Sequence, residues 1–249
     1  MTISELRVSD WFLIEAAYPT SGSNKLEYAI AYMATEEEGN YFKSVIAYMN
    51  FFLLIYALVS GQHVTYKTGA GTNLHKLSSL GKKRFTFGNF EKLEVEFTGK
   101  DEVWTKPIFK TKELFLKLLP SRKEIMESHV GLALIYYYVA VQASQRRFDQ
   151  AIINLMITLE ALLIKESTKF RKLISNRIAV LIAKDEKERL LISKRIKELY
   201  DLRSGIVHGG GKKPTFKNTK QLFSYTRQAI EKTLSLGTYS KEELIKKLS

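Results

Sequence analysis

The sequence predicts an α+β protein in which a mixed α/β domain, residues 1–111, is followed by an all-α domain, residues 112–249. In the first part, short apolar runs alternate with polar turns, as in strands. In the second part, apolar residues recur every three or four positions, as in helices. Charge changes at the same place, because residues 1–111 hold 12 basic and 12 acidic side chains, whereas residues 112–249 hold 27 and 14. The second part therefore carries the whole net charge of +13.

Strands are expected in the first part of the chain. Residues 11–18 and 26–33 are short apolar runs separated by the turn-rich sequence PTSGSN, which favours a pair of strands. Further along, the stretches HVTYKT, RFTFGNF and KLEVEFTG alternate or are rich in β-branched and aromatic residues. Two or three more strands are therefore expected there.

One segment of the first part is long and apolar. Residues 45–61, VIAYMNFFLLIYALVSG, are 17 uncharged residues, whereas a membrane-spanning helix needs about 20 apolar residues. The segment contains Asn50 and two tyrosines and has no strong basic flank. We therefore expect a buried core helix over residues 41–60. Insertion into a membrane is the alternative, which we disfavour.

Five helices and a short sixth are expected in the second part. The first begins at Ser121, because Glu124 three residues later completes a capping box, and it includes EIMESHVGLALIYYYVAVQASQ. The others are expected over residues 148–166, 169–183, 187–202 and 216–236, with the short one at 240–248. Because only short polar breaks separate them, these helices should form an antiparallel bundle.

The composition excludes several kinds of chemistry. The chain has no cysteine, so disulfides, cysteine-ligated zinc and thiol catalysis are ruled out, and a reducing compartment such as the cytoplasm is expected. The N-terminal residues MTISELRVSDWF lack the order of a signal peptide. The four histidines form no HExxH pair, and the chain has neither a GxSxG motif nor a Walker A motif. We expect no metal and no cofactor.

The basic charge of the second part indicates an anionic partner. Nucleic acid, and RNA in particular, is the leading candidate, and an anionic membrane surface is the second. The alternative explanation is a lysine-rich surface that only keeps the protein soluble.

The stretch LYDLRSGIVHGGGKK, residues 199–213, places Arg203 five positions before His208. On an unbroken helix five residues turn through about 140°, so the two side chains would face different ways. Gly205 and the glycine run after His208 allow the helix to end or bend here. We therefore expect both side chains at one rim.

An arginine and a histidine at one rim suffice for RNA cleavage without a metal. The histidine titrates near neutrality and can move protons, whereas the arginine can hold a phosphate and stabilise developing charge. The 2′-hydroxyl of RNA would be the nucleophile. Lys212 and Lys213 follow the glycine run and are expected to bind RNA.

The same residues also have a purely structural explanation. A histidine at a helix C-terminus interacts favourably with the helix dipole and often serves only as a cap. Arg203 would then pair with one of three carboxylates, those of Asp201, Glu198 and Glu160. We favour Glu160, in mid-helix on an otherwise apolar stripe, as a buried partner of the arginine.

Four features in a fixed order carry a resemblance to a known family. They are LEALL (159–163), FRKLISNRIAVLI (170–182), ELYDLRSGIVHGG (198–210) and a final helix. Residues 112–249 thereby resemble HEPN domains, the higher eukaryote and prokaryote nucleotide-binding family, and especially the Apea-like branch. The resemblance implies a helical bundle and metal-independent RNA cleavage of the kind found in toxins and antiviral effectors. In those enzymes the Arg-x4–6-His motifs of two protomers meet across a dimer interface.

By this resemblance, Arg203 stabilises the phosphate and His208 acts as acid, base or orienting group, with Ser204, Glu160 and Asp201 in support. Ser204 stands where active members commonly carry Asn, Asp or His, so a slow enzyme is expected. The expected function is a metal-independent endoribonuclease or RNA-binding effector of toxin or antiviral defence type. It would act as a homodimer, with an antitoxin or another defence protein as partner. The alternative is a non-catalytic HEPN module for dimerisation or nucleotide binding.

Overall fold

The computed structural model describes most of the chain. The described residues are 3–9, 12–17, 26–32, 41–61, 65–70, 91–97, 102–144, 146–166, 168–210 and 213–248. Side chains are described in residues 50–61 and 110–248, with the same gaps, and at Pro107. The chain divides into two compact units, one of residues 1–50 and 64–112 and the other of residues 51–63 and 113–249. We call the second one the helical unit.

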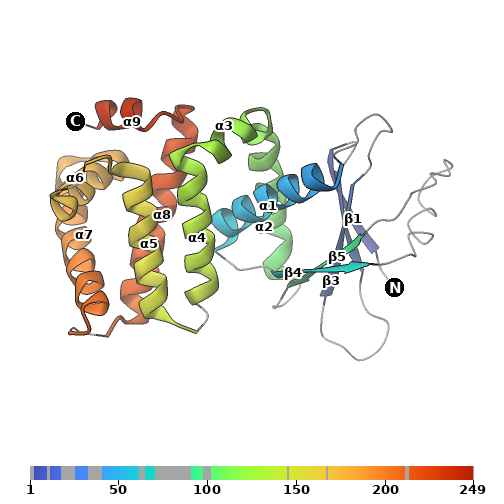
Figure 1. Cartoon of the computed structure of the whole chain (residues 1–249), viewed down its shortest axis with the longest axis horizontal. Helices are drawn as coiled ribbons and strands as arrows, with labels where there is room; N and C mark the ends of the chain where they lie inside the picture. Colours follow the sequence, from blue (N-terminus) through green and yellow to red (C-terminus); the bar gives the residue numbers. More distant parts are fainter. Residues whose placement is uncertain are drawn as a thin grey trace. The chain divides into compact units, whose positions relative to one another are not determined.

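Short connections join the helices of the chain from residue 102 onward (Figure 1). In chain order the described helices are α1 (Tyr41–Ser60), α2 (Glu102–Leu118), the 3-10 turn η2 (Leu119–Ser121), α3 (Arg122–Glu127), α4 (His129–Ser144), α5 (Phe148–Leu163), α6 (Phe170–Ile182), α7 (Glu186–Val207), α8 (Phe216–Leu236) and α9 (Lys241–Lys247).

The predicted α+β class, with an N-terminal mixed α/β domain, is wrong for the part of the chain whose side chains are described. That part is 84% helical and contains no strand, so it is all-helical. The apolar helix α1, which we assigned to the N-terminal domain, accounts for part of the difference. Phe51 and Phe52 of α1 are buried in the helical unit, with ring centroids 5.8 and 5.5 Å from that of Phe115. Among the described residues, no helix is both long and apolar enough to cross a membrane.

Five strands are described in the other unit. They are β1 (Ile3–Ser9), β2 (Phe12–Ala17), β3 (Leu26–Tyr32), β4 (Thr65–Ala70) and β5 (Glu91–Phe97). Neighbouring strands pair antiparallel in the order β1-β2-β3-β5-β4. Ile14 lies opposite Ile30 in the β2–β3 pair, and the β1–β2 register shifts between Arg7 and Ser9.

Helix α5 is the centre of the helical unit, because it packs against α4, α6, α7 and α8. Its fully buried apolar side chains recur at spacings of three and four: Ile152, Leu155, Met156, Leu159 and Leu162. Burial of each such side chain contributes about 1.5–3 kcal/mol relative to exposure. The predicted apolar stripe and the predicted helical bundle are confirmed.

The first predicted helix of the bundle is divided in two, and its predicted capping box is wrong. Ser121 ends the 3-10 turn, and its side chain makes no capping hydrogen bond to α3. Ser128 instead separates α3 from α4. Its hydroxyl donates to the Ile125 carbonyl at 2.8 Å and accepts from the Val130 amide at 3.1 Å.

Gly131 allows α4 to begin this close to α3. A Cβ at that position would lie 2.6 Å from the carbonyl oxygen of Ile125 and 2.7 Å from the Cα of Met126. Both contacts are to backbone, which cannot move aside as a flexible side chain can. Only glycine therefore fits here without a shift of one helix against the other.

Candidate active site at the end of helix α7

The Arg–His motif lies on an unbroken helix. Helix α7 begins after Asp185, whose carboxylate accepts a hydrogen bond from the Glu188 amide at 2.7 Å. The helix then continues through Arg203 and Gly205 to Val207. The local sequence supports this start, since Asp is among the preferred N-cap residues.

The helix ends in a Schellman motif whose C-cap residue is His208. The Gly209 amide donates to the Ile206 carbonyl at 3.4 Å, and the Gly210 amide donates to the Gly205 carbonyl at 3.1 Å. Gly209 has a φ of 72°, in the left-handed region that favours glycine. The bend that we expected at Gly205 is therefore absent, because the backbone leaves the helix only at Gly209.

Arg203 reaches from α7 towards α5 and is only partly satisfied there. Its Nη2 lies 4.0 Å from Oε1 of Glu160, and the two side chains are 23% and 25% exposed. That distance allows electrostatic attraction but is too long for a hydrogen bond. The guanidinium carbon lies 5.9 Å from the ring centroid of Tyr200, within cation–π range. Nε of Arg203 is buried and has no hydrogen-bond acceptor among the described residues.

The electrostatics of this cluster follow from its burial. Burial raises the pKa of Glu160 above its usual value, and the charge of Arg203 offsets part of that rise. Burial also raises the pKa of Tyr200, and the nearby Glu160 carboxylate adds to the effect. Ionisation of Glu160 is therefore less favourable in the folded chain than in the unfolded chain, even with a guanidinium close by.

His208 is exposed at the end of the helix, and its backbone amide donates to the Ser204 carbonyl at 3.1 Å. Among the described residues, no hydrogen bond or ion pair joins the side chains of Arg203 and His208. The five-residue helical step turns them about 140° apart. One copy of the chain therefore brings Arg203 to Glu160 and Tyr200 and leaves His208 in solvent.

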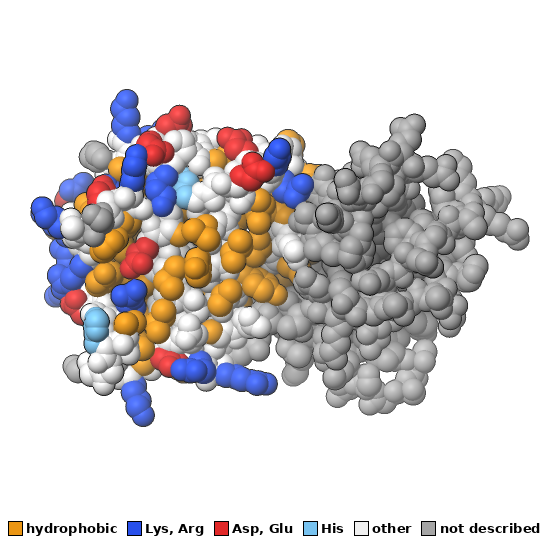
Figure 2. Space-filling view, in the orientation of Figure 1, with side chains coloured by type: hydrophobic (Ala, Val, Ile, Leu, Met, Phe, Trp, Pro, Cys, Tyr) orange, Lys and Arg blue, Asp and Glu red, His pale blue; other side chains and the backbone are white. Residues whose placement is uncertain are grey.

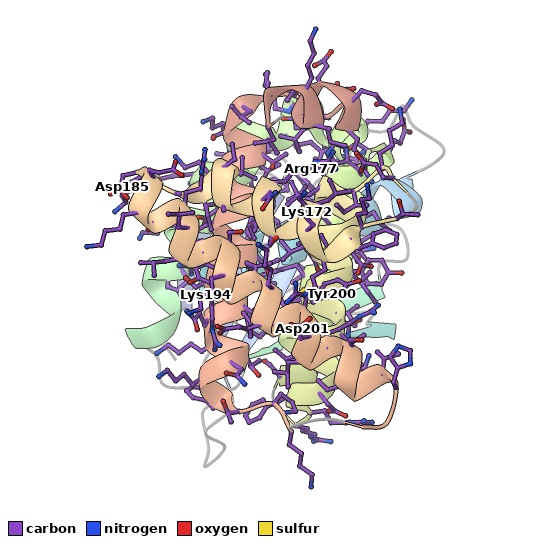
Figure 3. All side chains as sticks on the ribbon, turned by 90° about the vertical axis from the view of Figure 1, so that its left-hand side faces the viewer. Lys172, Arg177, Asp185, Lys194, Tyr200 and Asp201 are labelled. Atoms are coloured by element: carbon purple, nitrogen blue, oxygen red, sulfur yellow. The ribbon has the colours of Figure 1, made fainter. Side chains whose placement is uncertain are left out.

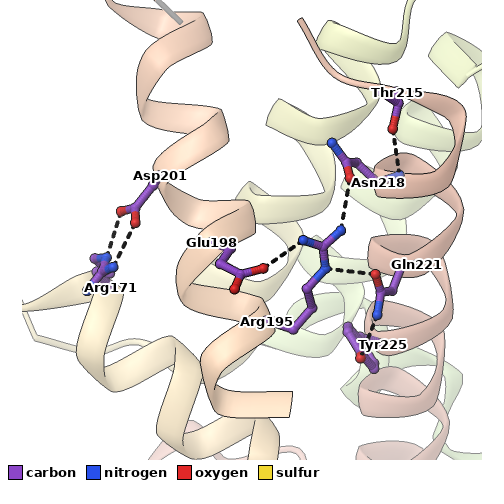
Figure 4. Close-up of polar contacts among 8 residues, drawn as sticks. All are labelled: Arg171, Arg195, Glu198, Asp201, Thr215, Asn218, Gln221 and Tyr225. Atoms are coloured by element: carbon purple, nitrogen blue, oxygen red, sulfur yellow. Dashed lines mark hydrogen bonds and ion pairs between the residues drawn. The ribbon is translucent and has the colours of Figure 1, made fainter. Parts of the chain in front are cut away.

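Two other carboxylates considered for Arg203 have other partners. Both oxygens of Asp201 accept from Arg171 of α6, at 2.6 and 2.7 Å (Figure 4). Glu198 accepts from Arg195, one turn earlier on α7, at 2.8 Å. Figure 3 shows Tyr200 and Asp201 next to each other on α7. Glu160 is therefore the carboxylate that faces Arg203.

Sequence reasoning missed the polar contacts that fix α7 against α8. Arg195 donates to Gln221 at 2.7 Å and to Asn218 at 2.9 Å, and Gln221 donates to the Tyr225 hydroxyl at 3.0 Å (Figure 4). Arg195 lies more than twenty positions from Asn218 and Gln221, so no local pattern links the two helices. The only local signal was the i, i+3 spacing of Arg195 and Glu198.

One of the two lysines predicted to bind RNA lies among the described residues. Lys213 is exposed just before α8. Lys212 lies outside the described residues. Figure 1 shows that the end of α7, the start of α8 and the α4–α5 turn lie at one end of the helical unit, and α9 lies at the other end.

No cluster of three or more histidine and carboxylate side chains that could hold a metal occurs within the described residues. Compared with known proteins, the chain matches no protein-family model, no curated protein and no solved structure.

Proposed function

We propose that the helical unit binds RNA and that two copies of it form a metal-independent endoribonuclease site from Arg203 and His208. The observation that supports this most is the incomplete bonding of Arg203. Its guanidinium lies 4.0 Å from Glu160, its side chain is 23% exposed, and its buried Nε has no acceptor among the described residues. Such a group retains donors for the oxygens of a phosphate.

A second copy is part of the proposal, because one helix turns Arg203 and His208 apart. A two-fold axis would bring together the Arg203 and His208 side chains of two copies, and both copies would use the same surface for the contact. Apolar side chains gather on the face over α4 and α5 (Figure 2). On α4, Leu132 and Ile135 are 47% and 42% exposed, which favours contact with another surface.

The chemistry needs only the substrate and these side chains. The 2′-hydroxyl of RNA attacks the adjacent phosphorus and gives its proton to a neutral His208 imidazole. The bond from phosphorus to the 5′-oxygen breaks, and that oxygen takes a proton from the partner subunit's His208. Arg203 stabilises the charge that develops on the non-bridging oxygens. The products are a 2′,3′-cyclic phosphate and a 5′-hydroxyl.

The test is cleavage of varied single-stranded RNAs in EDTA by the full chain, with the product ends identified. His208→Ala should lower the rate about 10²–10⁴-fold, as expected when a positioned acid or base is removed. Arg203→Lys should also be impaired, because lysine keeps the charge but loses the planar fork. Arg171→Lys is the matched control, since Arg171 is an exposed arginine paired with Asp201, and it should keep the wild-type rate. A 2′-deoxy residue at the cut site should block cleavage.

A non-catalytic module for dimerisation or nucleotide binding is the second candidate. It is favoured by the contacts of Arg203 with Glu160 and Tyr200, which already give the arginine a role in packing α7 on α5. In that case the wild type leaves every RNA intact, and His208→Ala changes only dimerisation or ligand binding. RNA cleavage by the wild type separates the two candidates, and a strict monomer in light scattering would exclude the two-copy site.

The biological setting belongs to the same proposal and rests on the HEPN resemblance and on the cysteine-free composition. A toxin or antiviral effector acting in the cytoplasm should slow growth when it is expressed alone. The His208→Ala chain, at equal abundance, should not.

A further inference from the structure

The end of the helical unit that carries His208 also presents an aromatic side chain to solvent. Phe216, the first residue of α8, is 65% exposed, the largest value among the exposed large apolar side chains described. Its position is fixed, because the Thr215 hydroxyl caps the helix by accepting from the Asn218 amide at 3.3 Å. The ring packs loosely against that of Phe148, with 6.1 Å between the ring centroids and 54° between the ring planes.

The sequence around Phe216 is basic. From residue 202 to residue 230 the sequence contains no aspartate or glutamate. Lys213 and Lys217 lie on either side of Phe216, and both are exposed. At the same end, Arg146 is exposed in the α4–α5 turn, whereas its neighbour Arg147 is paired with Asp149. Figure 2 shows basic side chains at this end of the helical unit as well as along its other edges.

An exposed aromatic ring between cations matches the chemistry of an unpaired nucleotide. A base stacks on the ring, and the flanking phosphates lie near the lysines. A base pair in a duplex cannot offer its face in this way without unstacking. The basic charge disfavours a basic or neutral partner, and a single exposed ring packed loosely against Phe148 is too small for a large apolar interface.

We propose that Phe216 is a stacking platform for an unpaired RNA base, with Lys213 and Lys217 binding the adjacent phosphates. The platform rests on the proposed RNA-binding function and adds a docking site at the bundle end that also carries His208. RNA held there has its backbone at the surface where His208 is exposed. The platform itself takes no part in bond breaking.

The experiment measures binding of a short fluorescent single-stranded oligoribonucleotide to the full chain carrying His208→Ala, so that cleavage cannot interfere. Phe216→Leu keeps an apolar side chain and the helix start but removes the π-face, and it should weaken binding about 10-fold. Phe216→Trp should bind at least as well as the parent. Leu190→Ala is the matched control, because Leu190 is 64% exposed near the start of α7, and it should change nothing. Circular dichroism confirms that each variant is folded.

Two further readouts identify the contacts. An oligonucleotide that contains 2-aminopurine should lose fluorescence on binding the parent, as stacked bases do, and should lose less on binding Phe216→Leu. Lys213→Ala with Lys217→Ala should reduce the slope of log K against log salt by roughly 0.7 for each phosphate contact removed. Lys232→Ala, further along α8, should leave the slope unchanged.

The outcomes separate this proposal from the one on which it rests. Should the parent bind RNA and Phe216→Leu bind it equally well, the platform is excluded and the RNA-binding function stands. A parent that ignores RNA at low salt excludes both. The platform is also excluded if heparin and RNA bind equally well and Phe216→Leu affects neither. It is excluded as well if Phe216→Leu weakens binding of an acidic peptide alone.

Discussion

Two arginines reach carboxylates beside helix α5, and they are satisfied to very different degrees. Arg177, from α6, is 8% exposed and donates to both carboxylate oxygens of Glu166. It also donates to the carbonyl of Leu163, the last residue of α5, at 2.8 Å. Arg203, from α7, has a single carboxylate at 4.0 Å and a buried Nε without an acceptor in the described part of the chain.

The two arginines therefore differ in the hydrogen bonds that they make within the described part of the chain. Arg177 closes the C-terminal end of α5, where helix carbonyls lack partners inside the helix, so its donors serve the fold. Arg203 places its charge 4.0 Å from Glu160 of α5, and its Nε has no acceptor among the residues that the structure describes. Burial alone does not distinguish the two roles, since both guanidinium groups are largely covered. The number of acceptors within hydrogen-bond distance does distinguish them.

The largest expected effect follows from removing the saturated arginine. Arg177→Met should lower the free energy of unfolding by about 3 kcal/mol, because it orphans the Leu163 carbonyl and removes charged hydrogen bonds. Urea denaturation followed by far-UV circular dichroism measures it. Arg203→Met is the matched control and should cost about 1 kcal/mol or less, since it breaks no hydrogen bond. Equal losses of unfolding free energy in the two variants would show that the two arginines do not differ in their contribution to stability.

A second prediction concerns pH, and the two glutamates should respond with opposite signs. Hydrogen bonds from Arg177 lower the pKa of Glu166 to about 2, below the unfolded value of 4.5. The stability that Glu166 contributes is therefore complete above pH 4.5 and is lost as pH falls from there towards about 2. Glu160 has a raised pKa, so its ionisation opposes folding at neutral pH, and that penalty disappears as pH falls through the raised pKa towards 4.5.

The measurement is the urea midpoint of Glu166→Gln and Glu160→Gln against the wild type at pH 7 and pH 3.5. The deficit of Glu166→Gln should shrink at the lower pH. Relative to the wild type, Glu160→Gln should be more stable at pH 7 than at pH 3.5. If both variants shift in the same direction, the assignment of opposite environments to these two carboxyl groups is wrong.

The smallest expected effect concerns the turn that holds Arg203 and His208 at the helix end. Gly209→Ala places a Cβ at a φ of 72° and should cost about 1 kcal/mol. Gly210→Ala is its control, because no atom lies within 4 Å of the added carbon and the backbone is not in the left-handed region. Thermal melts of both variants are sufficient. A Gly210→Ala loss as large as that of Gly209→Ala would show that the Schellman motif does not account for the helix end.

The sequence predicted best those elements whose ends have a local chemical cause. Helix α8 was predicted over its observed residues, since Thr215 caps its start and Gly237, with a φ of 62°, ends it. Helix α7 was predicted to end five residues too early, because composition does not show which glycine adopts a positive φ. The break at Ser128 was missed because the apolar pattern runs through it. The residue that marks this break is Gly131, where the backbone of α3 lies too close for a Cβ.

The candidate site could be predicted in its residues but not in its contacts. The Arg203–Glu160 approach was anticipated because a lone carboxylate interrupted an apolar stripe on α5. The Arg171–Asp201 and Arg177–Glu166 pairs were not anticipated, since each joins positions whose meeting depends on how helices pack. The chain-level fold class failed for a related reason. Residues 51–63 precede the strands β4 and β5 in sequence, but they group with the helical unit.

The backbone contact at Gly131 also limits how this chain can evolve. Every other amino acid begins its side chain with the atom that would collide with the Ile125 carbonyl, so the barrier does not depend on the size or polarity of the newcomer. A second substitution nearby cannot relieve the clash by making room, because the obstacle is main chain. A substitution at position 131 would therefore be tolerated only if the path of α3 changed, whereas a Cβ at Gly210 meets no described atom within 4 Å. Homologues of this protein should therefore keep glycine at this junction between α3 and α4.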